Sequence, residues 1–122
     1  MIEKLHKWTT NGNSHIRRLA SEGTRPRLPW AKHMNVLCGD VTINLSLLEK
    51  LITDESPYVR KSVGNHLNDL SKMYEQEVLR WMENMYTIHG RKVKWVIKHG
   101  LRSLLKDRNE RSMEIVRMIG DK

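Results

Sequence analysis

A weak internal repeat constrains the fold of this 122-residue chain more than any other feature. Residues 13–18 (NSHIRR) align with residues 56–61 (SPYVRK) at an offset of 43, and Tyr58-Val59 aligns with Trp95-Val96 at an offset of 37. Periods near 40 residues are typical of arrays of helix pairs, in which each pair buries its apolar side against its neighbours. We therefore expect consecutive helix pairs rather than a sheet.

Apolar residues recur at helical spacing along most of the chain, and no stretch alternates with a period of two. Asn13 or Ser14 would cap the second helix, Gly23 would end it, and Ser56 would cap the fourth. The fold expected is all-α, a right-handed HEAT-like superhelix of about three helix pairs, with one domain over residues 1–122. Its helices are expected at residues 1–10, 14–22, 40–52, 57–70, 74–85, 92–106 and 109–119.

The composition favours a polyanionic partner. Lys and Arg number 22 against 14 Asp and Glu, a formal net charge of +8, which points first to nucleic acid and second to an anionic membrane surface. The single cysteine, Cys38, excludes an intramolecular disulfide framework and a Cys-rich zinc site, and the scattered histidines argue against any metal site. No apolar run approaches the roughly 20 residues of a membrane span, and the N-terminus lacks a secretory signal. We expect a reduced, cytoplasmic protein.

The positive charge is concentrated toward the C-terminal half. No acidic residue lies between Asn84 and Lys106, and cations recur every four residues along the single helix expected at 92–106, at Lys94, Lys98, Arg102 and Lys106. Such a stripe would either face solvent or bind phosphates, and cations at matching places in the other repeats favour phosphates. The residues expected to contact nucleic acid are Arg17, Arg25, Arg27, Trp30, Arg60, Lys61, Lys94, Lys98 and Arg102.

The stretch at residues 15–30 (HIRRLASEGTRPRLPW) joins a helix to a stiff basic loop. Arg18 and Glu22 lie four residues apart and share one face of the helix, while two prolines hold the loop extended. Arg18 and Glu22 taken alone could form an ordinary surface ion pair, and Trp30 could cover the end of the core instead of touching a ligand. Three other ring side chains are expected to satisfy buried hydrogen bonds between repeats: Tyr58, His66 and His99.

This stretch resembles the signature of the AlkC branch of the AlkC/AlkD DNA alkylation repair glycosylases, whose chains are built from HEAT-like repeats. Two further segments fit the same family, residues 56–69 (SPYVRKSVGNHLND) and residues 95–104 (WVIKHGLRSL). The resemblance implies a double-stranded DNA partner that carries alkylated bases. It also implies hydrolysis of the N-glycosidic bond without a metal or another cofactor.

The resemblance further implies which residues carry the chemistry. Glu22 and Asp69 match pocket carboxylates of the family, and Arg18 matches the arginine one turn before the first of them. An N-alkylated base is already cationic and leaves readily, so the enzyme must stabilise the sugar as it becomes an oxocarbenium ion and supply a water. Asp69 would position the water and stabilise the cation, Glu22 would stabilise the cation, and Arg18 would orient Glu22 or hold a phosphate.

Two alternatives stay open on the sequence. Family members carry a further pocket glutamate from a preceding repeat, and this chain has no acidic residue at a matching place; it also looks short at its N-terminal side. A non-catalytic HEAT-like DNA-binding module would therefore fit the same motifs. A protein-interaction scaffold, a common use of helical repeats, is the third reading.

Overall fold

The computed structural model describes residues 2–22 and 41–119, and every regular element within them is a helix. This confirms the expected all-α fold. None of these helices is both long enough and apolar enough to cross a bilayer. The elements are α1 (Ile2–Trp8), α2 (Ser14–Glu22), α3 (Val41–Glu49), α4 (Pro57–Met73), α5 (Glu75–His89), the 3₁₀ turn η3 (Gly90–Val93), α6 (Lys94–Gly100), α7 (Arg102–Lys106) and α8 (Glu110–Ile119).

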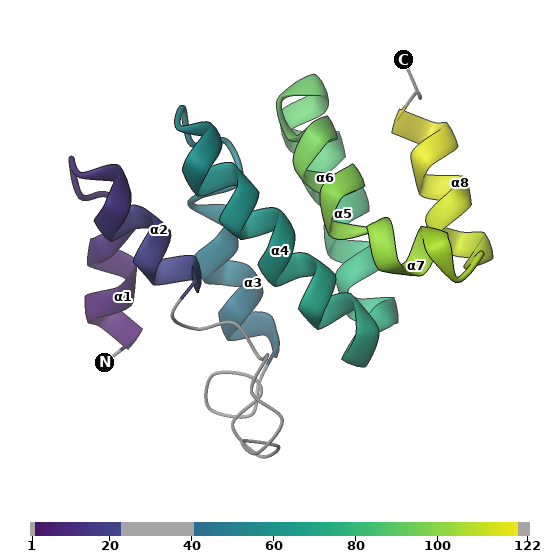
Figure 1. Ribbon diagram of the computed structural model, residues 1–122, viewed down its shortest axis with the longest axis horizontal. Coiled ribbons are helices and arrows are strands. Elements are labelled where there is room, and N and C mark those ends of the chain that lie inside the picture. The colour runs from purple at the N-terminus through teal and green to yellow at the C-terminus, as the bar shows by residue number, and fades with distance from the viewer. Residues whose placement is uncertain (1, 23–40, 120–122) are drawn as a thin grey trace.

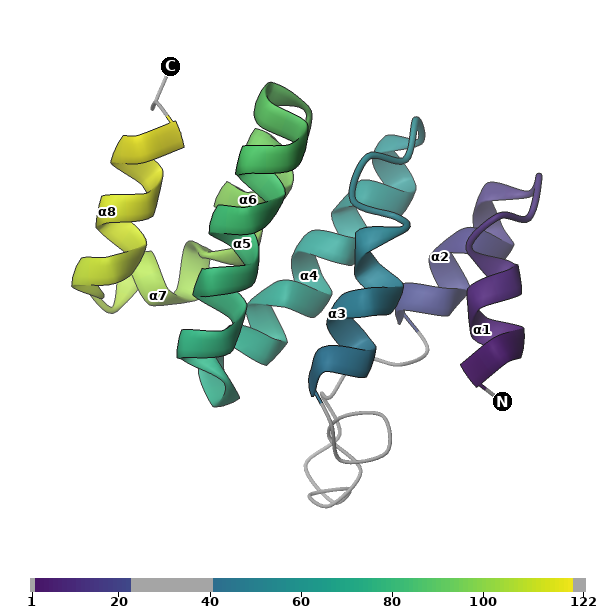
Figure 2. The ribbon, with the colours of Figure 1, turned by 180° about the vertical axis from the view of Figure 1, so that it is seen from behind.

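The helices are arranged in two layers. Figure 1 shows α2, α4 and α6 next to one another on the side facing the viewer, and Figure 2, seen from behind, shows α1, α3 and α5 covering the opposite side. Successive helices thus pair as α1 with α2, α3 with α4, and α5 with α6, and α7 and α8 follow at the C-terminal end. We call the surface formed by the front layer the α2–α4–α6 face.

Helix α4 lies at the centre of the core. Its apolar residues at the spacing expected from the sequence, Val59, Val63, Leu67 and Leu70, are all fully buried. Burying each such side chain contributes about 1.5–3 kcal/mol relative to leaving it in water. The neighbours that complete this core come from every pair: Ala20, Leu48, Leu51, Ile52, Val78, Leu79, Met82, Val96, Ile97 and Leu101.

The helix ends confirm one expected cap and correct another. The Asn13 side-chain Oδ1 accepts a hydrogen bond (2.8 Å) from the backbone N–H two residues later, and Asn109 holds the start of α8 in a similar way. Ser56 does precede α4, but its side chain makes no capping hydrogen bond. Its own backbone N–H instead donates to the Asp54 carboxylate at 2.9 Å. Gly23, the expected end of α2, lies outside the described residues.

The prediction of a single helix at residues 92–106 is wrong. The chain forms η3, then α6, and turns at Leu101 into α7, which runs across the end of α6 in Figure 1. The backbone N–H of Leu101 is shared between the carbonyls of Ile97 (3.0 Å) and Lys98 (3.2 Å), which tightens the chain locally. Beyond the turn, the backbone N–H of Ser103 donates to Oδ1 of the buried Asn68 at 3.1 Å. A side chain of α4 therefore satisfies a backbone donor that leaves the helical ladder.

Helices α4 and α6 approach closely at two glycines. A Cβ added to Gly64 would lie 2.6 Å from Cδ2 of His99, and one added to Gly100 would lie 2.9 Å from Cβ of Leu67. The Leu67 Cβ is fixed to the backbone of α4, so it cannot move away without separating the helices. These glycines let α4 and α6 pack closely against each other.

We expect Gly100→Ala to lower the free energy of unfolding by roughly 1–2 kcal/mol net, because the cost of overpacking exceeds the gain in helix propensity. Gly12→Ala is the matched control, since nothing lies within 4 Å of its added Cβ. Urea unfolding of both variants checks this. Equal midpoints for the two variants would contradict the close packing of α4 on α6.

Candidate functional site

A small pocket lies between α2 and α4 on the α2–α4–α6 face. It has a volume of about 250 Å³ and is lined by Arg18, Tyr58, Lys61, Ser62 and Asn65. The guanidinium carbon of Arg18 lies 4.6 Å from the centroid of the Tyr58 ring, a cation–π contact that fixes the arginine at the pocket edge. The pocket is therefore bordered by two cations, which suits an anionic ligand.

Asn65 links this pocket to the next repeat. Its Oδ1 accepts hydrogen bonds from Nε2 of His99 and from Nη2 of Arg102, both at 2.9 Å. An arginine can only donate, so this oxygen is the acceptor and His99 carries a proton on Nε2. Arg102 donates also to the backbone carbonyl of His99. The guanidinium of Arg102 is thus held beside α4, on the same face as Lys61.

The two candidate carboxylates belong to neighbouring parts of α2 and α4. Asp69 lies on α4 one turn after Asn65 and is half-buried. Glu22 is the last residue of α2; its backbone is described and its side chain lies outside what the structure describes. The carbonyl of Ser21, the residue before Glu22, accepts a hydrogen bond from His66, which precedes Asp69 by about one turn. The end of α2 therefore meets α4 close to Asp69.

A buried polar network, which the sequence did not reveal as a whole, fixes this junction. His66 is fully buried, its Nδ1 donates to the Ser21 carbonyl, and its Nε2 accepts from the Asn44 amide, both at 3.0 Å. The Ser62 hydroxyl donates to the Ser21 hydroxyl at 3.1 Å. The expectation that His66 satisfies buried hydrogen bonds is confirmed. Its partners, on α2 and α3, carry no signal in the sequence.

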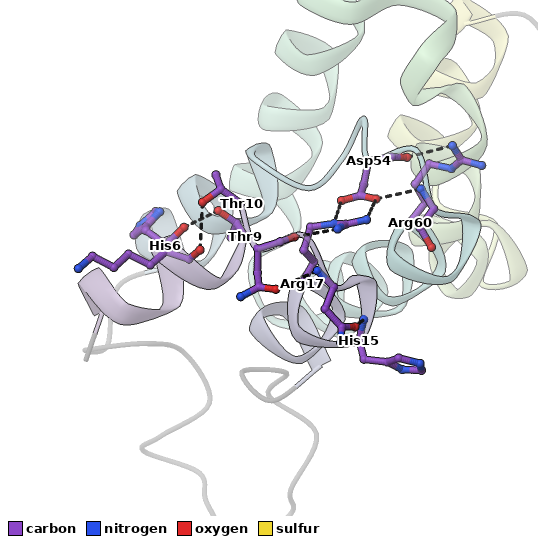
Figure 3. Close-up of polar contacts among 11 residues, drawn as sticks. His6, Thr9, Thr10, His15, Arg17, Asp54 and Arg60 are labelled. Atoms are coloured by element: carbon purple, nitrogen blue, oxygen red, sulfur yellow. Dashed lines mark hydrogen bonds and ion pairs between the residues drawn. The ribbon is translucent and has the colours of Figure 1, made fainter.

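The guanidinium of Arg17 is engaged by contacts within the protein. Its Nε and Nη2 donate to the Asp54 carboxylate at 2.7 and 3.2 Å, and its Nη1 donates to the Asn11 carbonyl at 2.8 Å. Figure 3 shows Asp54 between Arg17 and Arg60, whose Nη1 donates to the Asp54 backbone carbonyl. The Arg17 and Asp54 side chains are only 12% and 7% exposed, and the hydrogen bond to Asp54 raises the pKa of Arg17. Arg17 therefore joins the α1–α2 turn to the α3–α4 turn.

The remaining expected cations divide between helices. Lys94 and Lys98 are half-buried on α6, whereas Arg102 and Lys106 are exposed on α7, so the expected continuous stripe is broken at Leu101. Lys61 is exposed at the pocket between α2 and α4, which we call the Arg18 pocket, and Arg60 lines a different hollow. Arg25, Arg27 and Trp30 lie outside the described residues, and within residues 2–22 and 41–119 no three His, Cys, Asp or Glu side chains cluster as metal ligands would.

His6 and His99 have depressed pKa values. Burial chiefly, and then the charges of Arg102 and Lys61, lowers the pKa of His99, and burial together with Lys50 lowers that of His6. Below the usual value of 6.5, the unfolded chain therefore binds more protons than the folded one. The resulting stability is present above pH 6.5 and is lost as the pH falls toward the lower folded-state values.

We accordingly expect the free energy of unfolding, measured by urea titration, to fall between about pH 7.5 and about pH 5.5. The slope should be shallower in His99→Gln, which removes one of these groups. A wild-type slope of zero over this range, or an unchanged slope in the variant, would contradict the lowered pKa of His99.

Comparisons with known proteins agree with this fold. Residues 1–112 match the family model described as DNA alkylation repair enzyme. The chain is 45% identical over 115 residues to the uncharacterized protein YhaZ of Bacillus subtilis (strain 168), a match over 94% of this chain and 32% of that protein. It superposes with a TM-score of 0.80 and 40% identity on Pseudomonas fluorescens alkylpurine DNA glycosylase AlkC bound to DNA containing an abasic site analog, over 93% of this chain and 32% of that one. The chain thus spans about a third of the length of both relatives. It belongs to the DNA alkylation repair enzyme family.

Proposed function

We propose that this chain binds alkylated duplex DNA on the α2–α4–α6 face and hydrolyses the N-glycosidic bond of cationic N-alkylated bases. Family membership supports DNA repair, and the similar AlkC was solved with DNA whose abasic site corresponds to what base removal leaves behind. Since the chain covers about a third of that protein, its activity and its DNA partner are proposals for this chain.

The observation that carries the proposal is the grouping of cations and one carboxylate on a single face. Arg18 and Lys61 border the pocket, Arg102 is held beside it through Asn65, and Asp69 lies one turn farther along α4. Each phosphate that such cations neutralise releases condensed counterions from DNA, so binding should weaken steeply with salt. A carboxylate on this face repels the phosphates of bound DNA, a cost that is offset where the carboxylate meets positive charge in the ligand.

The chemistry proposed needs such a carboxylate. As the bond between C1′ and the base nitrogen breaks, the base leaves with the electron pair and becomes neutral, and positive charge develops on the sugar. Asp69 and Glu22 stabilise that charge, and Asp69 accepts a proton from the water that adds to C1′. Arg18 orients Glu22 or holds the adjacent phosphate.

Incubation of the chain with methylated duplex DNA tests the proposal, with free bases and abasic sites both measured. Release of bases above the uncatalysed rate supports it. Salt-sensitive binding of the duplex without release would replace it with a non-catalytic DNA-binding module. Binding of a protein partner that persists at high salt, with no affinity for DNA, would identify an interaction scaffold.

A further inference from the structure

A second hollow lies between the first turn of α4 and the start of α6, outside the residues proposed for base removal. It has a volume of about 400 Å³ and is lined by Pro57, Arg60, Lys92 and Trp95. The first two residues belong to α4, Lys92 to η3, and Trp95 to α6. We call this hollow the Trp95 pocket.

The indole of Trp95 is exposed and yet held in one orientation. The residue is 53% exposed, and its ring stacks on His99 with centroids 4.8 Å apart and planes 11° from parallel. His99 is in turn fixed by its hydrogen bond to Asn65. Trp95 lines the pocket and His99 does not. The part of the indole that faces the pocket is therefore not covered by the imidazole. The ring is thus a preorganised platform rather than a freely rotating surface side chain.

Among the described residues that line the Trp95 pocket, two are cations and none is acidic. The Arg60 guanidinium donates to the Asp54 backbone carbonyl, and the side chain makes no other hydrogen bond to a described residue. Lys92 is exposed and has no ion-pair partner among the residues that the structure describes. The carboxylate of the nearby Asp54 is bound by Arg17, and Glu55 does not line the pocket. The ligand that complements this rim is an anion.

We propose that the Trp95 pocket binds an unpaired nucleotide of a DNA strand, with the base stacked on the indole and the phosphate against Arg60 and Lys92. Sites for single-stranded nucleic acid combine these two elements, an aromatic platform and a cationic groove for the backbone. A base inside an intact duplex has both faces stacked and cannot use the platform. This site extends the proposed function, which concerns duplex DNA at the Arg18 pocket, and it does not depend on base removal.

Binding of a labelled, short oligodeoxythymidylate, followed by fluorescence anisotropy, tests the proposal. We expect Trp95→Ala to weaken binding roughly tenfold and Trp95→Phe, which keeps a ring, to retain most of it. Lys92→Gln should weaken binding and lower the slope of log affinity against log salt by about 0.7. Lys50→Gln, which removes an exposed cation after α3, is the charge-matched control and should leave both quantities unchanged.

Two further measurements decide the outcome. Oligonucleotide binding should quench tryptophan emission in the wild type and much less in Trp95→Phe, and thermal melts establish that the variants are folded. Equal affinity of wild type and Trp95→Ala for the oligonucleotide, or equally good competition by polyglutamate, would overturn the proposal. Because no alkylated base is present, a failure of base removal leaves this result interpretable, and a failure here leaves the base-release assay unaffected.

Discussion

Asp69→Asn is expected to release alkylated bases from duplex DNA about 10²–10³-fold more slowly than the wild type. Removing one preorganised electrostatic partner of a transition state typically costs that much. Asparagine has nearly the shape of aspartate but carries no charge, so it can neither stabilise the oxocarbenium ion nor accept the proton of the attacking water. Base release under single-turnover conditions measures the chemical step directly.

Duplex affinity separates lost chemistry from lost binding. Asp69→Asn removes a negative charge from a cationic face, so duplex DNA should bind the variant as tightly as the wild type or more tightly. Asp107→Asn makes the same change at an exposed position after α7 and serves as the control, with base release unchanged. If Asp69→Asn releases bases at the wild-type rate, this carboxylate has no role in the mechanism, whatever the affinity of the variant for duplex DNA.

The helices could be predicted because their signals are local. The apolar spacing of α4 from Val59 to Leu70 and the asparagine at position 13 act within one or two turns of the chain, and the structure confirms both. The length of the last helices could not be predicted in this way. The turn at Leu101 is supported by Asn68, which is distant in sequence and reaches the chain only once α4 and α7 have packed together.

The candidate site shows the same division between local and distant information. The four-residue spacing of Arg18 and Glu22 places them on one helix face, but only the family resemblance connects Asp69 with them. Arg17 looks like its neighbour Arg18 in sequence, yet it pairs with Asp54, 37 residues away. Which of two adjacent arginines faces a ligand depends on how the repeats stack, and that information is spread over several helices.

His66→Ala is expected to lower the free energy of unfolding by about 3–5 kcal/mol, the largest effect on stability that we foresee. The variant loses the buried hydrogen bonds that His66 makes with the Ser21 carbonyl and the Asn44 amide, at about 0.5–1.5 kcal/mol for each, and opens a cavity beside the core. The total free energy of unfolding of a domain of this size is about 5–15 kcal/mol, so the loss is a large fraction of it. Urea unfolding provides the measurement.

His15→Ala is the control, because His15 is exposed and its ring only meets the edge of Tyr58. We expect its free energy of unfolding to lie within about 0.5 kcal/mol of the wild-type value. His66 also holds the carbonyl that precedes Glu22, so its loss should slow base release even at temperatures where His66→Ala remains folded. A variant as stable as the wild type would mean that water replaces the imidazole at no cost. A destabilised variant with wild-type release would instead show that the end of α2 does not need this anchor for catalysis.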